Sequence, residues 1–442
     1  MEKKLNTKRH IWPLSLLLLG SGAIYLLDSS LLLKQTTLLL GIYGLLFLIT
    51  FFTLQRNRIN LSWGIFIGIT FRLITLIESP HLSDDFARFY WDGKLTTEGI
   101  NPYDYKPSEL DLNDLPSIHS EDFERLNSPE YFSVYPPFMQ YVYAALAFIS
   151  PSVDWFCRWF SILIILVDLA TFTLLSRLLR VYQKKKELAL LFFLNPLIIL
   201  EFTSNLHAEA FLSLFVVGSI YSLRHNKSIL LGIFLALAIL CKIYPLLFLP
   251  FFLFRKTIAP IKTLIALSAC IIALSIPLLN LERIAHVQES LTFYYALFEF
   301  NGAIYYFING IGTAIMGYNT IGIVGSLLFI VCGLIITSIL GLFVIKKRMT
   351  LEFALLAVLF FYFSLSTTLM PWYICVLLPL GILTDLKMPM VWTFVVFSSY
   401  SAFGHVDFQE AKWLVYCSYG ILPLSLYLER KKIKESFGIA FT

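Results

Sequence analysis

Charged residues are scarce in this sequence. Asp, Glu, Lys and Arg make up 14% of its 442 residues, whereas a soluble domain carries about 25%. Hydrophobic residues make up 58%, and apolar runs of roughly 17 to 25 residues, each long enough to cross a bilayer core, recur along most of the chain. No internal repeat, low-complexity tract or soluble domain is apparent. The composition therefore predicts an all-α polytopic membrane protein, with residues 1–442 as a single membrane domain.

The cysteines form no ligand or disulfide pattern. There are six, mostly inside apolar runs, and neither Cys-x-x-Cys nor a Cys/His spacing typical of a metal site appears. We interpret them as small packing residues. The net charge of +5 does not indicate nucleic acid as a partner, because the basic residues lie in short loops between apolar runs. No small-residue cleavage site follows the first apolar run, so we expect a retained helix.

Loop charge predicts the topology, because Lys and Arg gather on the cytoplasmic side of membrane proteins. The clusters placed inside are Lys3, Lys4, Lys8 and Arg9; Arg56 and Arg58; Arg177 through Lys186; Arg224 and Lys227; Arg255, Lys256 and Lys262; Lys346, Lys347 and Arg348; and Arg430 through Lys434. About 12 transmembrane helices result, near 11–27, 36–54, 62–78, 155–177, 188–203, 208–223, 259–279, 319–345, 351–369, 372–386, 388–403 and 411–428. Both termini are then cytoplasmic.

The same argument defines two loops on the outer side. The first is 79–154, in which residues 81–132 carry 12 Asp/Glu against 4 Lys/Arg. The second is 281–318. Residues 138–150 are apolar but short, which predicts a juxtamembrane or re-entrant helix. Residues 228–254 lie between two inside clusters and form either a tight pair of spans or a hairpin that re-enters from the cytoplasm.

The first outer loop begins with a helix signal. Ser83 is a good N-cap, and Asp84 and Asp85 follow in the first turn, where negative charge suits the helix dipole. We expect the helix to reach Glu98, with Gly99 as the residue that ends it.

One side of this helix is charged. Asp85, Arg88 and Asp92 have the i, i+3, i+7 spacing that places them on one face. Phe86, Phe89 and Tyr90 give it an aromatic side, which favours an interfacial helix. An alternative is that the aspartates only cap the helix and that Arg88 only pairs with them.

A carboxylate beside cations at a membrane surface suits sugar transfer from a lipid phosphate to a hydroxyl. The acceptor oxygen must lose a proton, which a carboxylate within hydrogen-bond reach can take as general base. The leaving lipid phosphate needs positive charge from Arg or Lys, or a donor such as His. We therefore interpret the first outer loop as the catalytic loop of a membrane glycosyltransferase.

Other ionisable residues lie in or near the spans, where they are costly and often functional. Arg72, toward the outer end of its span, is a candidate for binding the phosphate, with snorkelling to the interface as the alternative. His207 and Glu209 stand at an outer helix start, where they bind a phosphate or cap the helix. Lys242 reaches a lipid phosphate or pairs with a carboxylate such as Asp168, which we interpret as a bundle contact.

The order of several motifs resembles bacterial GT-C mannosyltransferase-like proteins, which are related to the GPI and dolichol-phosphate-mannose-dependent mannosyltransferases. The resemblance runs from about residue 62 to 386. Its motifs are Ser83 through Gly93, Gly99 through Tyr103, Tyr135-Pro136-Pro137, Asn195-Pro196-Leu197 with Glu201, Asn205 and His207, Lys242 with Tyr244-Pro245, Phe300-Asn301-Gly302, and Pro371-Trp372-Tyr373.

The resemblance implies a GT-C-type fold with its active site at the outer face of the bacterial inner membrane. It implies a polyprenyl-phosphate sugar as donor, usually no metal or other cofactor, and Asp85 as the base, with Asp84 able to share the role. The residues it assigns to substrate or lipid-phosphate binding, together with those from charge alone, are Arg72, Arg88, Asp92, His207, Glu209, Lys242, Tyr135, Asn301, Trp372 and Tyr373.

The sequence departs from the family pattern at two positions. Leu206 stands where the family often has Gly, and Glu209 stands where it often has Asp. The catalytic loop also follows the third predicted helix instead of the first, so two helices are added at the N-terminus.

The resulting hypothesis is transfer of a hexose, with mannose favoured, to a periplasmic or outer-leaflet glycan, lipid or protein. One alternative is a lipid-linked sugar flippase or transporter, although such folds tend to show repeats. Another is an O-antigen ligase-like or polymerase-like enzyme with a pyrophosphate-linked donor. A divalent-metal site on Asp84 and Asp85 is a further alternative.

Overall fold

The computed structural model describes residues 2–32, 34–115, 118–255, 257–296, 298–346, 349–404 and 410–436. Within these ranges the chain is helical and contains no strand, apart from one isolated β-bridge between Phe300 and Thr368. The all-α prediction is confirmed. Lys256, Lys347 and Arg348, which we placed on the cytoplasmic side, lie outside the described residues.

The α-helices follow one another along the whole chain. They are α1 Glu2–Asp28, α2 Thr36–Gln55, α3 Leu61–Ile74, α4 Asp85–Thr97, α5 Ser120–Glu124, α6 Pro137–Phe148, α7 Val153–Val181, α8 Leu190–Phe193, α9 Pro196–Ile198, α10 Glu209–Arg224, α11 Ser228–Cys241, α12 Leu249–Leu253, α13 Pro260–Ser275, α14 Leu281–Ala296, α15 Ala303–Met316, α16 Ile321–Gly341, α17 Leu351–Ser364, α18 Leu377–Thr384, α19 Met388–Val395, α20 Lys412–Leu428 and α21 Arg430–Ser436.

Four helices among the described residues are long and apolar enough to cross a membrane. They are Ile11–Asp28 of α1, then α2, α7 and Ile321–Ile345, and they coincide with four of the predicted crossings. A fifth span results if the bent pair Lys186–Phe193 and Pro196–Ser204 is taken as one. The other predicted crossings fall on helices of at most 17 residues. The count of about 12 spans is therefore not confirmed.

The bend in the fifth candidate span has a local cause. The two halves meet at an angle of 53°, where Pro196 has no amide hydrogen and forces the preceding Asn195 out of the helical region. The Asn195 side chain caps the second half by accepting from the amides of Leu197 and Ile198. A crossing that hydropathy predicts as continuous is thus two helices, and the second continues as a π-helix, Ile199–Ser204, toward His207.

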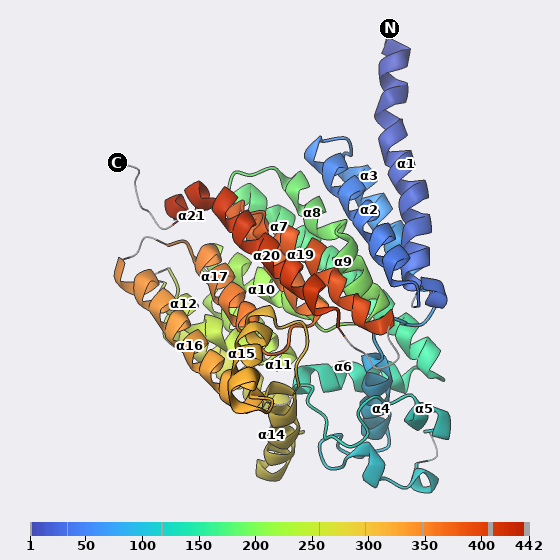
Figure 1. The fold of residues 1–442 in the computed structure, drawn as a ribbon, viewed down its shortest axis with the longest axis vertical. Helices are drawn as coiled ribbons and strands as arrows, with labels where there is room; N and C mark the ends of the chain where they lie inside the picture. The colour runs from blue at the N-terminus through green and yellow to red at the C-terminus, as the bar shows by residue number, and fades with distance from the viewer. Residues whose placement is uncertain are drawn as a thin grey trace.

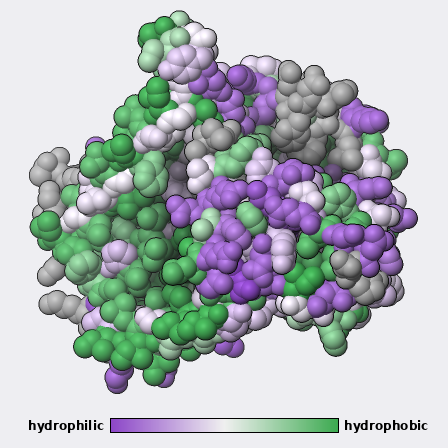
Figure 2. Space-filling view, turned by 90° about the horizontal axis from the view of Figure 1, so that it is seen from below, coloured by the Kyte–Doolittle hydropathy of each residue, from purple (hydrophilic) through white to green (hydrophobic). Residues whose placement is uncertain are grey.

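Figure 1 shows the two ends of the molecule. The start of α1 and helix α21 lie at one end, and α4, α5 and α14 lie at the other. Seen from that second end, in Figure 2, hydrophilic side chains gather over the side of the molecule where α4 and α5 lie, and apolar ones dominate the other side. The predicted loops 79–154 and 281–318 therefore share one end of the fold.

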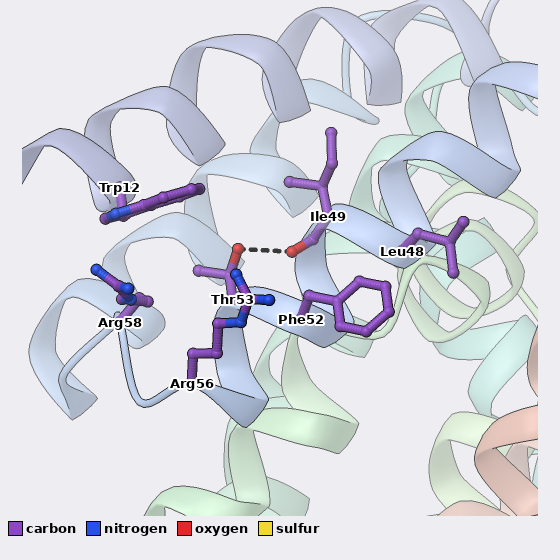
Figure 3. Close-up of a pocket in the computed structure, with 7 residues that line it drawn as sticks. All are labelled: Trp12, Leu48, Ile49, Phe52, Thr53, Arg56 and Arg58. Atoms are coloured by element: carbon purple, nitrogen blue, oxygen red, sulfur yellow. Dashed lines mark hydrogen bonds between the residues drawn. The ribbon is translucent and has the colours of Figure 1, made fainter.

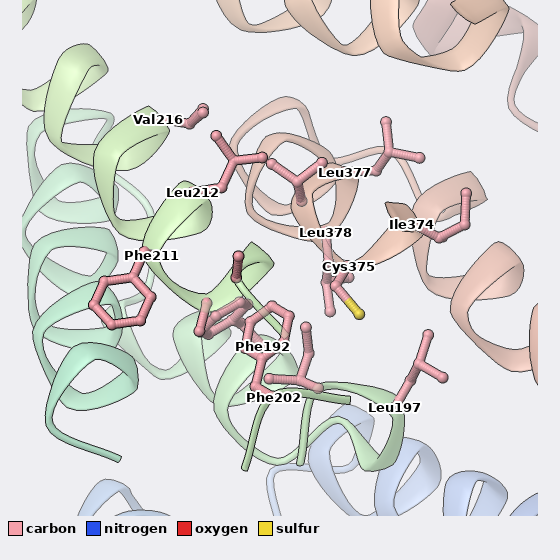
Figure 4. Packing of buried hydrophobic residues seen from close by; sticks show 14 of the residues in the cluster. Phe192, Leu197, Phe202, Phe211, Leu212, Val216, Ile374, Cys375, Leu377 and Leu378 are labelled. Carbon is pink, nitrogen blue, oxygen red and sulfur yellow. The ribbon is translucent and has the colours of Figure 1, made fainter. Parts of the chain in front are cut away.

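The core lies between α7, α10, the α8–α9 region and α18. Phe192, Phe202, Leu212, Cys375 and Leu378 are each at most 1% exposed and interdigitate there (Figure 4). Such close packing holds helices together in a membrane, where the surroundings are as apolar as the side chains. All six cysteines are free thiols; four of them are buried as expected for packing residues, whereas Cys270 is partly buried and Cys417 is exposed.

Helix α4 is buried on its charged side as well as on its aromatic side, and its position at the membrane interface stays a prediction. Its residues from Phe86 to Gly93 are all buried, because α6 and α7 pack on one side and the loop that follows α4 covers the other. Gly93 allows the close approach to α6, since a Cβ there would lie 2.5 Å from the carbonyl oxygen of Tyr143. The helix begins at Asp85, with Asp84 in place of Ser83 at the N-cap, and Gly99 ends it at φ +80°, as expected.

Two other short segments agree with the sequence. The apolar segment 138–150 lies mostly in the short helix α6, Pro137–Phe148. Residues 228–254 form two short apolar helices, α11 and Tyr244–Leu253, which are separated at Lys242, where the backbone is extended. Whether this pair crosses the bilayer or re-enters it stays a prediction.

Candidate active site

At the start of α4, two neighbouring carboxylates accept hydrogen bonds from the same side-chain amide. The Asn127 Nδ2 atom donates to Asp84 Oδ1 at 2.7 Å and to Asp85 Oδ1 at 3.3 Å. Asp84 is exposed, whereas Asp85 is partly buried. The two aspartates are therefore unequal, and the inner one faces the body of the protein.

The surroundings of Asp85 make it a stronger base than an ordinary aspartate. Burial and the charge of Asp84 raise its pKa to about 6, and Glu209 adds to this, while Asn127 and the charge of Lys242 oppose it. Glu209 and Lys242 are thus near enough for their charges to act on Asp85, although both lie more than 100 positions away in the sequence. A carboxylate with a pKa near working pH suits a general base.

Glu209 and Lys242 form an ion pair beside Asp85. Lys242 Nζ lies 2.6 Å from Glu209 Oε1 and 4.3 Å from the centre of the Tyr373 ring. The Glu209 side chain is 1% exposed and that of Lys242 is 27% exposed. The second oxygen, Oε2 of Glu209, has no hydrogen-bond partner in the described structure. A buried charge whose oxygen accepts no hydrogen bond is costly. This oxygen is therefore able to accept a hydrogen bond from a bound ligand.

His207 lies flat on Trp372. The two rings are stacked with centroids 3.6 Å apart and an interplanar angle of 16°. The His207 Nε2 atom is 3.5 Å from Glu201 Oε2, too far for a good hydrogen bond. Burial first, and the charge of Lys242 second, lower the pKa of His207 well below its usual value, so the imidazole is neutral.

The residue before His207 has an unusual backbone conformation. Leu206 has φ +64°, a left-handed conformation that glycine adopts freely and that strains a residue with a Cβ. The glycine that the family often has at this position suits the backbone conformation. In this chain a leucine adopts it and is fully buried.

Glu201 stabilises the turn that contains Leu206 and His207. Its carboxylate accepts from Tyr400 Oη at 2.7 Å and from Asn205 Nδ2 at 3.1 Å, and all three side chains are buried. The network fixes the π-helical turn that carries His207. Tyr400 was not a sequence candidate, and no local motif marks it.

Two tyrosine hydroxyls near these carboxylates were not predicted as site groups, although Tyr244 stands in the motif that contains Lys242. Tyr143 and Tyr244 are buried, and neither hydroxyl has a hydrogen-bond partner in the described residues. Burial raises the pKa of Tyr143, and the charges of Asp85 and Glu209 add to the effect. Tyr143 lies in α6 and stacks on Phe89 of α4. Unpartnered polar groups from separate helices thus converge with Glu209, as in a site for a polar ligand.

Arg88 and Asp92 support the site rather than line it. They pair at 2.8 Å, both almost fully buried. Arg88 also donates to the carbonyls of Ser128 and Tyr131, and Asp92 accepts from Ser133 and Gln140. These contacts hold the segment that follows Asn127 against α4 and help to place Asn127 beside the two aspartates.

Arg72 contacts other residues inside the helix bundle and does not contact the candidate active site in the described structure. Its guanidinium is fully buried and pairs with Asp168 at 2.8 Å, donates to the Phe193 carbonyl at 2.8 Å and lies over the Phe193 ring. Asp168 is therefore the bundle contact that we expected, and its partner is Arg72 and not Lys242. Because Arg72 bridges α3, α7 and α8 inside the bundle, we leave it out of the proposed site.

Tyr135 and Asn301 connect segments of backbone. Tyr135 packs edge-on against Phe89 and Tyr143, and its carbonyl accepts from Tyr103 Oη. Asn301 has φ +53°. It donates from its amide to Glu410 and from Nδ2 to the Leu369 carbonyl, and its own carbonyl accepts from Tyr419. Asn301 thus joins the second outer loop to the segment before Trp372.

Among the described residues, no group of three or more His, Cys, Asp or Glu is placed to hold a metal ion. The arrangement that the structure brings together is Asp84, Asp85, Glu209, Lys242, His207, Trp372 and Tyr373. It combines a carboxylate of raised pKa, a cation and a neutral imidazole that is stacked on an aromatic ring. The carboxylate is able to accept a proton, and the cation is able to stabilise an anion.

A family model described as alpha-(1->6)-mannopyranosyltransferase, N-terminal domain, matches residues 14–257. The match covers more than half of the chain and includes Asp85, His207, Glu209 and Lys242. Trp372 and Tyr373 lie beyond it. No curated protein matches the chain.

Proposed function

Since the chain belongs to the alpha-(1->6)-mannopyranosyltransferase family, we propose that it is a GT-C-type mannosyltransferase and that it uses a polyprenyl-phosphate sugar as donor. The sugar transferred is mannose, and the acceptor is a hydroxyl of a glycan, lipid or protein at the outer face of a bacterial inner membrane. The observation that carries the assignment of the site is that Asp85 lies beside the ion pair of Lys242 and Glu209, in which Nζ and Oε1 are 2.6 Å apart.

In the proposed reaction the acceptor oxygen attacks the anomeric carbon while its proton passes to Asp85. The bond between that carbon and the phosphate oxygen breaks, and its electron pair leaves with the lipid phosphate. The base must be ionised at the start, which a pKa of about 6 allows at neutral pH. Asp84 keeps the pKa of Asp85 raised, and Asn127 keeps the carboxylate in place.

Lys242 is the cation proposed for the leaving phosphate. Its ammonium is partly exposed and already near Asp85, and a charge in this position stabilises the anion that forms. Glu209 holds Lys242 in place in the absence of substrate. The neutral His207, stacked on Trp372, supplies a hydrogen-bond donor or a flat surface for the sugar. The outward orientation is supported by the loop charges and by the common end of α4 and α14 (Figure 1).

The test is transfer by the purified protein in lipid nanodiscs. The donors are radiolabelled polyprenyl-phosphate sugars, with mannose first, and the acceptors come from a membrane and glycan extract. We expect labelled product with polyprenyl-phosphate mannose from the wild type and from Glu121→Gln, which neutralises an exposed carboxylate of the same loop. We expect none above background from Asp85→Asn.

Four results would replace or change the proposal. Label that crosses the bilayer without a covalent product indicates a flippase. Transfer only from a pyrophosphate-linked glycan indicates a ligase-like or polymerase-like enzyme. Full activity of Asp85→Asn removes Asp85 as the base, and loss of activity in chelator introduces the metal-dependent alternative.

A further inference from the structure

A separate cavity lies at the end of the molecule away from the candidate active site. It has a volume of about 300 Å³ and lies between α1, α2 and the turn that follows α2. Figure 3 shows Trp12 from α1 above Arg58, with Arg56, Leu48 and Phe52 along α2 and its end. None of these residues belongs to the site described above.

The cavity has an apolar part and a cationic part. Leu48 and Phe52 are 43% and 50% exposed, on a helix that is long and apolar enough to cross a membrane. Arg56 and Arg58 follow directly after that helix, at the point where the apolar run ends. A molecule that filled the cavity would meet hydrocarbon side chains first and then two guanidinium groups.

The two arginines have no acidic partner in the described structure. The lining residues include no Asp or Glu, and no ion pair of the described chain involves Arg56 or Arg58. The contact found for Arg58 is with the Trp12 ring, whose centre lies 5.3 Å from its guanidinium carbon. Thr53, which also lines the cavity, donates its hydroxyl within α2 to the Ile49 carbonyl.

We propose that this cavity binds the headgroup of an anionic phospholipid of the surrounding bilayer. Paired guanidinium groups match the oxygen atoms of a phosphate diester, each through two parallel hydrogen bonds. The exposed Leu48 and Phe52 then contact the upper part of the acyl chains, and Trp12 lies at the boundary, where indole rings are stable in membranes. Basic residues at this position also suit the anionic leaflet of the cytoplasmic side.

Native mass spectrometry of the full-length protein tests this lipid site. The protein is incubated with equal amounts of dioleoyl phosphatidylglycerol and dioleoyl phosphatidylcholine in mild detergent. We expect the wild type to retain phosphatidylglycerol preferentially, and Arg56→Gln/Arg58→Gln to lower that retention by at least about fivefold. Arg56→Lys/Arg58→Lys keeps the charges but not the planar forks, so its retention should fall between the two.

The matched control is Arg177→Gln/Arg180→Gln. It removes two positive charges from exposed positions near the end of α7 that do not line the cavity, and this variant should retain phosphatidylglycerol as the wild type does. Equal retention by the Arg56→Gln/Arg58→Gln variant and by this control would overturn the proposal. So would displacement of the bound lipid by inorganic phosphate alone, or stronger retention of a polyprenyl phosphate, since the cavity would then serve a free anion or the sugar carrier. None of these results depends on transfer activity.

Discussion

At each end of helix α10 a buried glutamate forms an ion pair with a cation. The two ion pairs differ in the number of hydrogen-bond partners that the glutamate has. At its start, Glu209 pairs with Lys242 from α11; at its end, Arg224 pairs with Glu352 from the first turn of α17. The two glutamate side chains are equally buried, at 1% and 2% exposed, and both cations are partly exposed. The two glutamates are therefore almost equally buried and differ in their hydrogen-bond partners.

The pair at the end of α10 is closed. Glu352 Oε1 accepts from Arg224 at 2.9 Å and from the Tyr182 hydroxyl, and Arg224 Nε donates to the same hydroxyl at 2.7 Å. Three helix ends are joined in this way. The pair at the start of α10 has one short contact to a lysine, and Glu209 Oε2 has no partner in the described structure. We infer that the closed pair stabilises the bundle and that the open pair binds substrate.

The largest expected effect concerns the base beside the open pair. Asp85→Asn should lower the rate of sugar transfer at pH 8 by about 100-fold to 10,000-fold, because the amide cannot accept the acceptor's proton. Its unfolding temperature should stay near that of the wild type, since Asp85 is partly buried and its charge is already disfavoured. Initial rates and thermal unfolding of the purified proteins check both statements, with Glu121→Gln as the control.

The two glutamates should respond in opposite ways to the same substitution. Glu352→Gln should lower the free energy of unfolding by about 1–2 kcal/mol, because it weakens charge-assisted hydrogen bonds to two partners. Its transfer rate per folded molecule should stay unchanged. Glu209→Gln should lower the transfer rate by about tenfold to a hundredfold, since Lys242 loses the group that positions it, with a smaller change in stability.

Thermal unfolding and transfer rates of these two variants measured side by side decide between the roles. If Glu209→Gln destabilised the protein more and left transfer intact, the open pair would be a structural contact like the closed one.

Lys242→Gln should change the donor dependence and the pH dependence of transfer together. Removing the cation should raise the KM for the polyprenyl-phosphate donor by about tenfold. It should also move the loss of activity at low pH to a higher pH, because the charge of Lys242 lowers the pKa of Asp85. Lys242→Arg keeps the charge and should shift the pH dependence little. An unchanged KM in Lys242→Gln would remove Lys242 from the phosphate site.

The smallest effect is expected from Asp84→Asn. The charge of Asp84 raises the pKa of Asp85, so its removal should let Asp85 stay ionised at lower pH. The loss of activity on acidification should then occur at a lower pH, with the rate at pH 8 within about twofold of the wild type. A rate loss as large as that of Asp85→Asn would instead make Asp84 the base.

The sequence predicted the local features of the outer loop well. The helix that carries Asp85, its end at Gly99 and the short helix α6 all follow from capping residues and run lengths that act within a few positions. The burial of α4 on all sides was not predicted, because the loop that covers it has no apolar period of its own. Its contact is made by the Arg88–Asp92 pair and backbone carbonyls.

The sequence did not predict which distant charged residues form ion pairs with one another. Arg72 and Lys242 are both cations among apolar residues, and hydropathy does not tell which one faces a carboxylate of the bundle and which one faces the site. The structure gives Asp168 to Arg72 and Glu209 to Lys242, a choice that depends on how α3 and α11 are rotated. Hydropathy did not reveal the break at Pro196, where the predicted crossing 188–203 is divided into two helices, because the apolar run continues through the break.

The most direct test of the central claim is the pH dependence of mannose transfer by the wild type and by Asp85→Asn. Asp85 is active as a carboxylate, so the wild-type rate should fall as the pH decreases through about 6. The residual rate of Asp85→Asn should not show this fall. If the variant retained the same fall near pH 6, or if the wild-type rate rose on acidification, Asp85 would not be the base.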